Sequence, residues 1–165
     1  MLRKEKMNAM KALKKELEEL QRDPIVTFGV TVGAINNDLF HWRITMLGPN
    51  DSPYAGGFFT LVADFPDDYP NHGPKVTFKN KMYHLNVSKE GNVCISTLNN
   101  WVKGTTMSEV LSLIFAFFYK QNPKNPYDHG MAELYENNRE LFDKNVREYT
   151  AKYANIQDDI NINNN

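Results

Sequence analysis

The sequence predicts a single-domain α/β fold of the α+β type, with an N-terminal helix, a four-stranded antiparallel meander and C-terminal helices. Apolar residues recur at helical spacing near the N-terminus, alternate at strand spacing between residues 25 and 79, and return to helical spacing after residue 106. The chain has 165 residues, which suits one domain, and no repeat or linker divides it. We therefore expect a domain over residues 1–154 and a polar, disordered tail over residues 155–165.

The first helix is expected over residues 7–22, because apolar side chains recur there at the spacing of one helical face. These side chains are Met10, Leu13, Leu17 and Leu20, and we expect them to face the core. Asp23-Pro24 ends the helix, since proline disfavours the helical conformation of the preceding residue.

Four runs of β-forming residues follow, over residues 25–34, 39–47, 58–65 and 75–79. Their connections are rich in turn-forming residues, as in Asn36-Asn37-Asp38. Because no crossover helix intervenes, consecutive strands are expected to pair in antiparallel fashion.

A long, weakly periodic segment, residues 80–105, contains the one cysteine of the chain. A loop of this length in a compact domain is often functional. Thr106 and Glu109 then have the spacing of a capping box, which predicts the start of a helix. This helix is apolar nearly all round, so we expect it to be buried and to end at Pro123 and Pro126.

The last two helices are expected over residues 130–137 and 139–153. In the second of them, apolar side chains again follow helical spacing and should face inward. They are Phe142, Val146, Tyr149 and Tyr153.

Composition argues against several classes of function. The chain carries 19 basic and 20 acidic residues, a balance that disfavours general nucleic-acid binding. A single cysteine excludes an intramolecular disulfide and fits the cytoplasm or the nucleus, although a secreted cysteine-poor protein is an alternative. The N-terminus is too charged for a signal peptide, and the run Val110–Tyr119 is about half of a membrane span. His41, His72 and His129 lack ligand partners at metal spacing, so we expect no metal. We also expect a monomer without nucleic-acid or membrane partners.

Several short motifs occur in a fixed order along the chain. They are Phe40-His41-Trp42, Gly48-Pro49, Tyr54-Ala55-Gly56-Gly57, Phe65-Pro66-Asp67-Asp68-Tyr69-Pro70, His84-Leu85-Asn86, Gly91-Asn92-Val93-Cys94, Trp101 and Asn122-Pro123. With this ordered set, residues 7–154 resemble the ubiquitin-conjugating enzymes. The resemblance implies that family's fold, in which an N-terminal helix, a four-stranded antiparallel sheet and C-terminal helices occur in this order.

The resemblance also implies thioester chemistry. A cysteine of the family takes the C-terminal glycine of ubiquitin or a ubiquitin-like modifier from an activating enzyme, and passes it to a lysine or to a ligase cysteine. ATP is used upstream by the activating enzyme, so no bound cofactor is expected. The expected partners are therefore the modifier, the activating enzyme and a ubiquitin ligase.

Cys94 is the candidate nucleophile, because a thiolate attacks thioesters well and leaves readily when an amine attacks. The alternative is a small buried hydrophobe. Asn86 is similar to the family's asparagine that stabilises the tetrahedral oxyanion, and its alternative role is to hold the loop through local hydrogen bonds.

His84 is expected to organise the loop rather than to act as a general base. Leu85 stands where the family usually has proline, and it restores both an amide donor and unfolded-state freedom. We therefore expect a less rigid loop here.

Asn125 falls where many family members carry an acidic residue beside the cysteine. Asparagine can orient an incoming lysine but cannot accept its proton. Discharge to free lysine is therefore expected to be slow, unless Asp128 compensates.

Partner surfaces are expected on the first helix and on two loops. The helix carries a basic face that resembles the family's surface for the activating enzyme, and a solvated helix face is the alternative; the residues are Lys4, Lys11, Lys14 and Lys15. Asn71 and Lys103 stand at loop positions where the family's ligase surface is often apolar, which predicts weak binding of the usual ligases or a specialised partner.

Three other readings stay open at this point. The chain could carry a ubiquitin-like modifier other than ubiquitin, or it could be a non-catalytic binding module of the same fold, against which Cys94 argues. An unrelated cysteine hydrolase is the third, and it would act without an activating enzyme or ATP.

Overall fold

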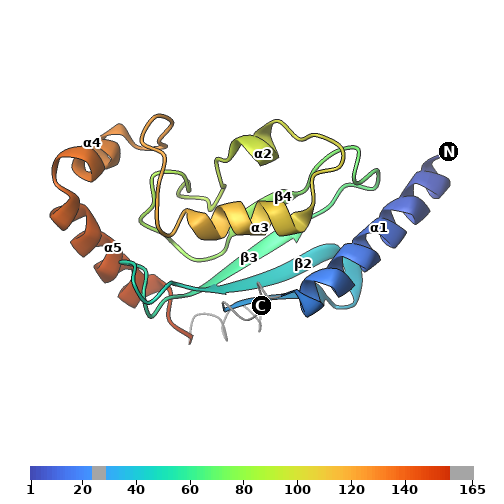
Figure 1. The fold of residues 1–165 in the computed structure, drawn as a ribbon, viewed down its shortest axis with the longest axis horizontal. Coiled ribbons are helices and arrows are strands. Elements are labelled where there is room, and N and C mark those ends of the chain that lie inside the picture. The colour runs from blue at the N-terminus through green and yellow to red at the C-terminus, as the bar shows by residue number, and fades with distance from the viewer. Residues whose placement is uncertain (24–28, 157–165) are drawn as a thin grey trace.

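The computed structural model describes residues 1–23 and 29–156. Its elements are α1 (Leu2–Arg22), β1 (Val30–Ile35), β2 (Asp38–Leu47), β3 (Phe58–Asp64), β4 (Lys75–Phe78), α2 (Ser96–Asn99), α3 (Met107–Ala116), α4 (His129–Asn137) and α5 (Arg139–Tyr153). Figure 1 shows α1 at one end of the sheet, the α4–α5 pair at the other, and α3 lying along the sheet between them. This order of elements confirms the predicted α+β fold.

The sheet is a meander in the order β1-β2-β3-β4, with every neighbouring pair antiparallel. Trp42 lies opposite Ala34 on one side and Ala63 on the other. Asn36 and Asn37 make the tight turn from β1 to β2 with φ values of 52° and 61°, a conformation that asparagine tolerates better than most residues. Of the strand predicted over residues 25–34, residues 25–28 lie outside the described part of the chain.

Helix α1 begins five residues before the predicted position 7 and ends as expected at Arg22. Its buried face consists of Ala9, Leu13, Leu17 and Leu20. Met10 is 43% exposed, so its predicted place in the core is wrong. Ala9 and Met10 both precede Leu13 by about one helical turn, four and three positions earlier. Of the two, Ala9 is the one on the buried face.

Helix α3 starts with the predicted capping box, in which Thr106 and Glu109 bond each other's backbone. It buries one face, made of Met107, Val110, Leu111 and Ile114. The expectation of burial all round is wrong, because the helix lies on the sheet with its other side open and Leu113 is 44% exposed. The helix also ends at Ala116, well before Pro123.

Helices α4 and α5 lie within one residue of their predicted bounds. The buried stripe of α5 is Phe142, Val146 and Thr150, whereas Tyr149 is exposed and Tyr153 half-buried. The predicted inward face is therefore wrong at its C-terminal end, where the stripe follows a step of four rather than three. Residues 157–165 of the predicted tail lie outside the described residues.

The segment over residues 80–105 is a folded connection rather than a structureless loop. It contains α2 and a short antiparallel bridge between Val87 and Val93. At its start, the buried Asn80 accepts the Thr60 N–H at 2.7 Å and donates to the Tyr153 carbonyl at 3.0 Å. The segment is thus attached to both β3 and the end of α5.

Candidate functional site

Cys94 lies in the segment that leads into α2, and its thiol is free and half-buried. The side chain lines a recess of about 360 Å³, whose walls also come from α3 and from the segment after it. The Cys94 N–H donates a 2.8 Å hydrogen bond to the Asn86 carbonyl, which anchors the backbone under the sulfur. Gly91 permits this path, because its φ is +88° and a Cβ there would lie 2.0 Å from the Phe78 carbonyl oxygen. The candidate nucleophile therefore faces an open recess.

Two side-chain amides approach the Cys94 sulfur from different segments. Asn125 Nδ2 donates toward Sγ at 3.4 Å, and Asn99 Nδ2 donates toward it at 3.7 Å. The sequence predicts Asn125 beside the sulfur but does not point to Asn99. The sequence signal for Asn99 is only a run of polar residues after the cysteine. Asn99 comes near Sγ because the single turn of α2 brings the chain back toward Cys94.

The Asn86 side chain has no exposed surface, and its hydrogen bonds stay within the protein. Its Nδ2 donates to the carbonyls of Asn122 at 2.9 Å and Asn125 at 3.3 Å, and its Oδ1 accepts the Asn122 N–H at 2.8 Å. The sequence allows two roles for Asn86, oxyanion stabilisation and holding the loop, and this geometry corresponds to the second. The oxyanion role stays a prediction, and it requires the amide to exchange one of these carbonyl partners.

His84 is 2% exposed and bonds through both ring nitrogens. Nδ1 accepts the Asn86 N–H at 2.9 Å, which leaves the proton on Nε2 to be donated to the Phe117 carbonyl at 2.9 Å. Burial lowers the pKa of His84 to about 4, and the bond to Phe117 opposes part of that shift. The ring is neutral at pH 7 and joins the histidine segment to the end of α3.

Leu85 is fully buried, and both of its backbone groups are bonded. Its N–H donates to Gln121 Oε1 at 2.7 Å, a bond that proline cannot make, and its carbonyl accepts the Tyr127 N–H at 2.9 Å. Gln121 is itself fixed by the hydroxyls of Tyr54 at 2.8 Å and Tyr135 at 3.2 Å. The predicted loss of rigidity is therefore offset by a partner 36 positions away in the chain.

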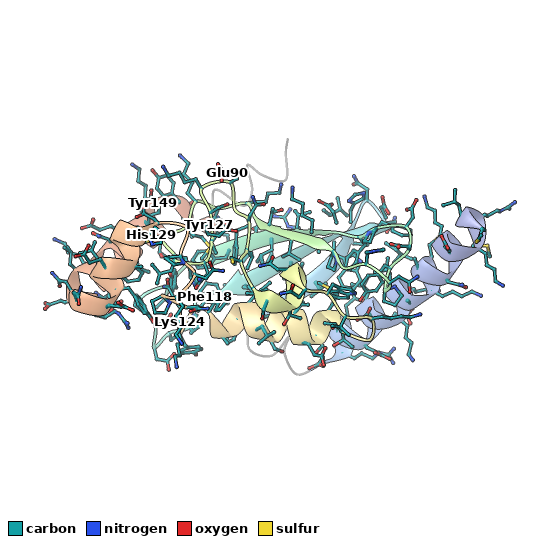
Figure 2. The ribbon with its side chains drawn as sticks, turned by 90° about the horizontal axis from the view of Figure 1, so that it is seen from above. Glu90, Phe118, Lys124, Tyr127, His129 and Tyr149 are labelled. Atoms are coloured by element: carbon teal, nitrogen blue, oxygen red, sulfur yellow. The ribbon has the colours of Figure 1, made fainter. Side chains whose placement is uncertain are left out.

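Tyr127 is a second residue that the sequence does not point to. It lines an adjoining recess of about 300 Å³ together with Asn99 and Lys75. Partial burial raises the pKa of the Tyr127 hydroxyl, and the charges of ionised Cys94 and Glu90 raise it further. Figure 2 shows Tyr127 in the segment between α3 and α4.

Asp128 was a possible substitute for an acidic residue at position 125, but the structure gives its carboxylate another function. Asp128 Oδ1 accepts the Met131 N–H at 3.0 Å and so caps the N-terminus of α4. The side chains that bond the sulfur among the described residues are thus both neutral amides.

Comparison with known proteins agrees with this fold. The family model described as ubiquitin-conjugating enzyme matches residues 12–150. The chain belongs to the ubiquitin-conjugating enzyme family. The solved E2 domain of a Toxoplasma gondii ubiquitin-conjugating enzyme is 32% identical in sequence, with a TM-score of 0.77, over 87% of this chain and 97% of that chain. The family and the fold predicted from the sequence are confirmed.

In this member of the ubiquitin-conjugating enzyme family, the predicted partner residues lie on exposed surface. On α1 they are Lys4, Lys11, Lys14 and Lys15, and on the two loops they are Asn71 and Lys103. Trp101 joins the two loops, since its Nε1 donates to the Pro70 carbonyl at 2.9 Å. Glu16 of α1 accepts the Tyr69 hydroxyl and the Met107 N–H, the latter at 2.9 Å. The helix and both loops therefore form one connected surface.

The surface formed by α1 and the two loops keeps some apolar area despite its departures from the family pattern. Val102, next to Lys103, is 68% exposed. The expectation that the usual ligases bind weakly stays a prediction.

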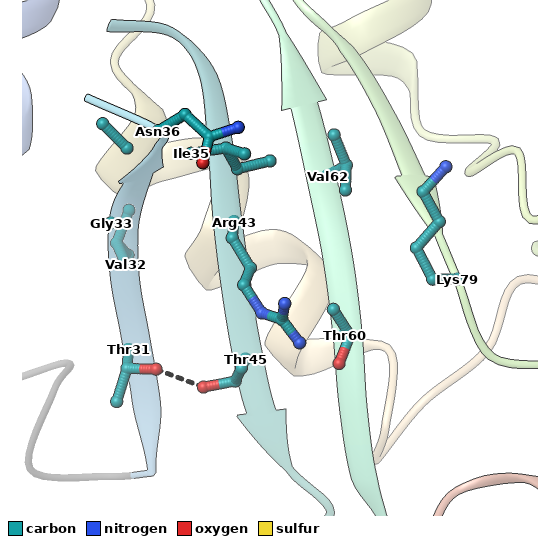
Figure 3. A pocket seen from close by; sticks show the side chains of 11 residues that line it. Thr31, Val32, Gly33, Ile35, Asn36, Arg43, Thr45, Thr60, Val62 and Lys79 are labelled. Atoms are coloured by element: carbon teal, nitrogen blue, oxygen red, sulfur yellow. Dashed lines mark hydrogen bonds between the residues drawn. The ribbon is translucent and has the colours of Figure 1, made fainter. Parts of the chain in front are cut away.

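A larger recess, of about 730 Å³, lies on the open face of the sheet (Figure 3). Its floor includes Arg43 and the hydrogen-bonded hydroxyls of Thr31 and Thr45. Its lining contains no thiol or carboxylate, and Cys94 does not contribute to it. The chemistry of a conjugating enzyme therefore points to the smaller recess.

Two further observations concern cofactors and membranes. Within residues 1–23 and 29–156, no group of three or more His, Cys, Asp or Glu side chains is arranged to hold a metal ion. In the same part of the chain, every helix is too short or too polar to span a bilayer.

Proposed function

We propose that this chain carries ubiquitin or a ubiquitin-like modifier as a thioester on Cys94 and passes it to a substrate amine or a ligase thiol. The observation that carries this proposal is the position of Cys94. Its free thiol lines an open recess, on a backbone held by the Asn86 carbonyl, in a chain of the ubiquitin-conjugating enzyme family.

In the first step, the Cys94 thiolate attacks the carbonyl carbon of the modifier's thioester on the activating enzyme. A new C–S bond forms at Cys94, and the C–S bond to the activating enzyme breaks, so that its sulfur leaves as a thiolate. In the second step, an amine attacks the Cys94 thioester, a C–N bond forms, the Cys94 sulfur leaves, and the amine releases its proton to solvent.

The supporting residues have separate tasks in this scheme. Asn86 connects the cysteine segment to the 122–125 segment, and His84 connects the Asn86 backbone to the end of α3. Asn125 lies beside the sulfur, where it can orient an incoming amine. The exposed lysines of α1 and the loops that Trp101 joins would meet the activating enzyme and a ligase.

A charging assay tests the proposal directly. The full chain is incubated with activating enzyme, ATP and purified ubiquitin or one of several ubiquitin-like modifiers, and the products are separated with and without thiol reductant. We expect a reductant-sensitive product with one modifier, its loss in Cys94→Ala, and a reductant-resistant oxyester in Cys94→Ser. If no modifier in the panel charges the wild-type chain, the proposal is wrong and a binding module of the same fold is favoured.

The same assay separates a hydrolase from a carrier. A cysteine hydrolase would cleave modifier–amide substrates without activating enzyme or ATP. We expect no such cleavage, since transfer from an activated thioester is the step that the proposal assigns to Cys94.

A further inference from the structure

Asn99 lies where the two recesses beside Cys94 meet. It lines the recess that contains the sulfur and also the neighbouring one that contains Tyr127. Its side chain is exposed, and Sγ is its only side-chain hydrogen-bond partner among the described residues. A group that entered through the Tyr127 recess would pass the Asn99 amide before it reached the sulfur.

Asn86 is not free to make this contact. Both of its Nδ2 hydrogens go to backbone carbonyls, and its side chain is fully buried. One of these carbonyls belongs to Asn125, so Asn86 holds in place the backbone of a residue that does reach Sγ. The amides directed at the reacting sulfur therefore come from positions 99 and 125.

We propose that Asn99 is a catalytic residue of this site: its amide N–H, together with that of Asn125, stabilises the negative charge on the Cys94 sulfur when it attacks or leaves. The inference rests on the proposed function for its role in transfer. In both steps the sulfur carries a full or developing negative charge, while the C–S bond is still to be formed or is breaking. A neutral amide donor stabilises that charge without placing a competing cation or acid in the recess.

The first test needs no partner protein. The rate at which iodoacetamide alkylates Cys94 is measured from pH 6 to pH 10 in wild type, Asn99→Ala and Asn99→Asp. We expect Asn99→Ala to slow alkylation at pH 7 about threefold, as for a lost weak hydrogen bond to a charged atom, with rates converging at high pH. Asn99→Asp should slow it further, because its carboxylate repels the thiolate.

The matched control is Asn137→Ala. Asn137 is also an exposed asparagine at the last position of a helix, but it lies at the end of α4 and lines neither recess. Its alkylation profile should equal that of the wild type. Equal slowing at every pH in Asn99→Ala would indicate altered access rather than charge stabilisation and would overturn the inference, as would an unchanged profile.

The second test measures transfer. Chains charged with modifier are mixed with free lysine, and we expect Asn99→Ala to slow discharge by about the same factor as alkylation at pH 7. If the wild type charges but wild type and Asn99→Ala do not differ in alkylation or in discharge, the inference about Asn99 is wrong and the proposed function stands. Failure of the wild type to charge overturns the proposed function, while the alkylation profile still decides whether Asn99 stabilises the thiolate.

Discussion

Two parts of the molecule, which we call the sulfur end (around Cys94) and the partner end (around Tyr69 and Trp101), hold their exposed residues in place by different means. Around Cys94, the connections are buried hydrogen bonds of fixed direction, made by His84, Asn86 and Gln121 to backbone groups. At the predicted partner end, aromatic packing between Tyr69 and Trp101, one hydrogen bond from Trp101 to the Pro70 carbonyl and a single carboxylate, Glu16, join α1 to two loops.

The difference follows from what each end must fix. A reacting sulfur has to be held within a fraction of an ångström, and directional bonds to backbone groups achieve this. A docking surface needs only a firm support for side chains that project into solvent, which packed rings supply. Mutations at the two ends should therefore separate effects on chemistry from effects on recognition.

The largest effect is expected from Asn86→Ala. The substitution removes three hydrogen bonds of the fully buried Asn86 side chain and leaves the Asn122 N–H and two carbonyls of the part-buried 122–125 segment without this partner. We expect the free energy of unfolding to fall by about 4 kcal/mol. Urea unfolding measures this, and a loss below about 1 kcal/mol would show that the network contributes little to stability.

Acid should break the same network through His84. The pKa of His84 falls from 6.5 to about 4 on folding, so the unfolded chain binds the extra proton first. The free energy of unfolding should therefore drop by about 3 kcal/mol as pH falls from 6.5 to 4, and then level off with respect to this group. Urea unfolding across this range, with NMR titration of the His84 ring, checks the prediction. A ring that titrates near 6.5 in the folded state would refute it.

The pKa of His41 shifts in the opposite direction to that of His84. The hydrogen bond that His41 Nδ1 donates to the Asp64 carboxylate is the main cause that raises the pKa of His41, with the charge of Asp38 adding to it. Its stabilising contribution is thus present below pH 6.5 and is lost as pH rises through the raised value. In a His41→Gln variant, the free energy of unfolding should therefore still fall below pH 6.5, because that fall comes from His84.

Leu85→Pro, which restores the usual family residue, should destabilise this chain. It removes the donor to Gln121 and leaves Oε1 of a buried side chain unpaired, at a cost of about 2 kcal/mol that exceeds the gain from a stiffer unfolded chain. Thermal unfolding of Leu85→Pro and of the matched Leu85→Ile, which keeps the N–H, tests this. A more stable proline variant would mean that the Gln121 bond is dispensable.

Glu16→Ala should loosen the partner end with a smaller effect. It removes the acceptor of the Tyr69 hydroxyl and of the first N–H of α3, and we expect a loss of about 1 kcal/mol. The alkylation rate of Cys94 should stay at the wild-type value. A changed rate would show that the two ends are coupled.

Asn125→Asp is expected to leave stability nearly unchanged and to affect only the chemistry. The carboxylate can accept the amine's proton, so discharge to free lysine should rise. The same change replaces an amide donor to Sγ by a negative charge, so alkylation at pH 7 should fall. Measuring both rates on one preparation shows whether position 125 acts on the amine, on the sulfur or on both.

The sequence predicts the elements whose patterns are local. The capping box of Thr106 and Glu109, the asparagine turn at 36–37 and the bounds of α4 and α5 are each visible within a few residues. Local patterns do not determine which of two neighbouring helical positions faces the sheet, so Met10 and Tyr149 were placed inward although Ala9 and Thr150 are buried.

The site itself was only partly predictable. Cys94, His84 and Asn86 follow from an ordered motif, and Asn125 follows from its distance from Trp101. Gln121 contacts a residue 36 positions away, and Asn99 comes near Sγ only because the single turn of α2 brings it back, so the linear pattern points to neither residue. The sequence around Leu85 therefore does not show that Gln121 supplies a hydrogen-bond partner to the amide that leucine restores, and the rigidity of this loop stays a prediction.

The bond between Leu85 and Gln121 has a practical consequence for hybrid proteins. Replacing residues 80–95 with those of a relative that has proline at position 85 would leave Gln121 Oε1 without its hydrogen-bond donor. Replacing only the 117–128 segment with one that lacks this glutamine would leave the Leu85 N–H without its acceptor. The two segments can therefore be exchanged only together, although they are separate stretches of the sequence.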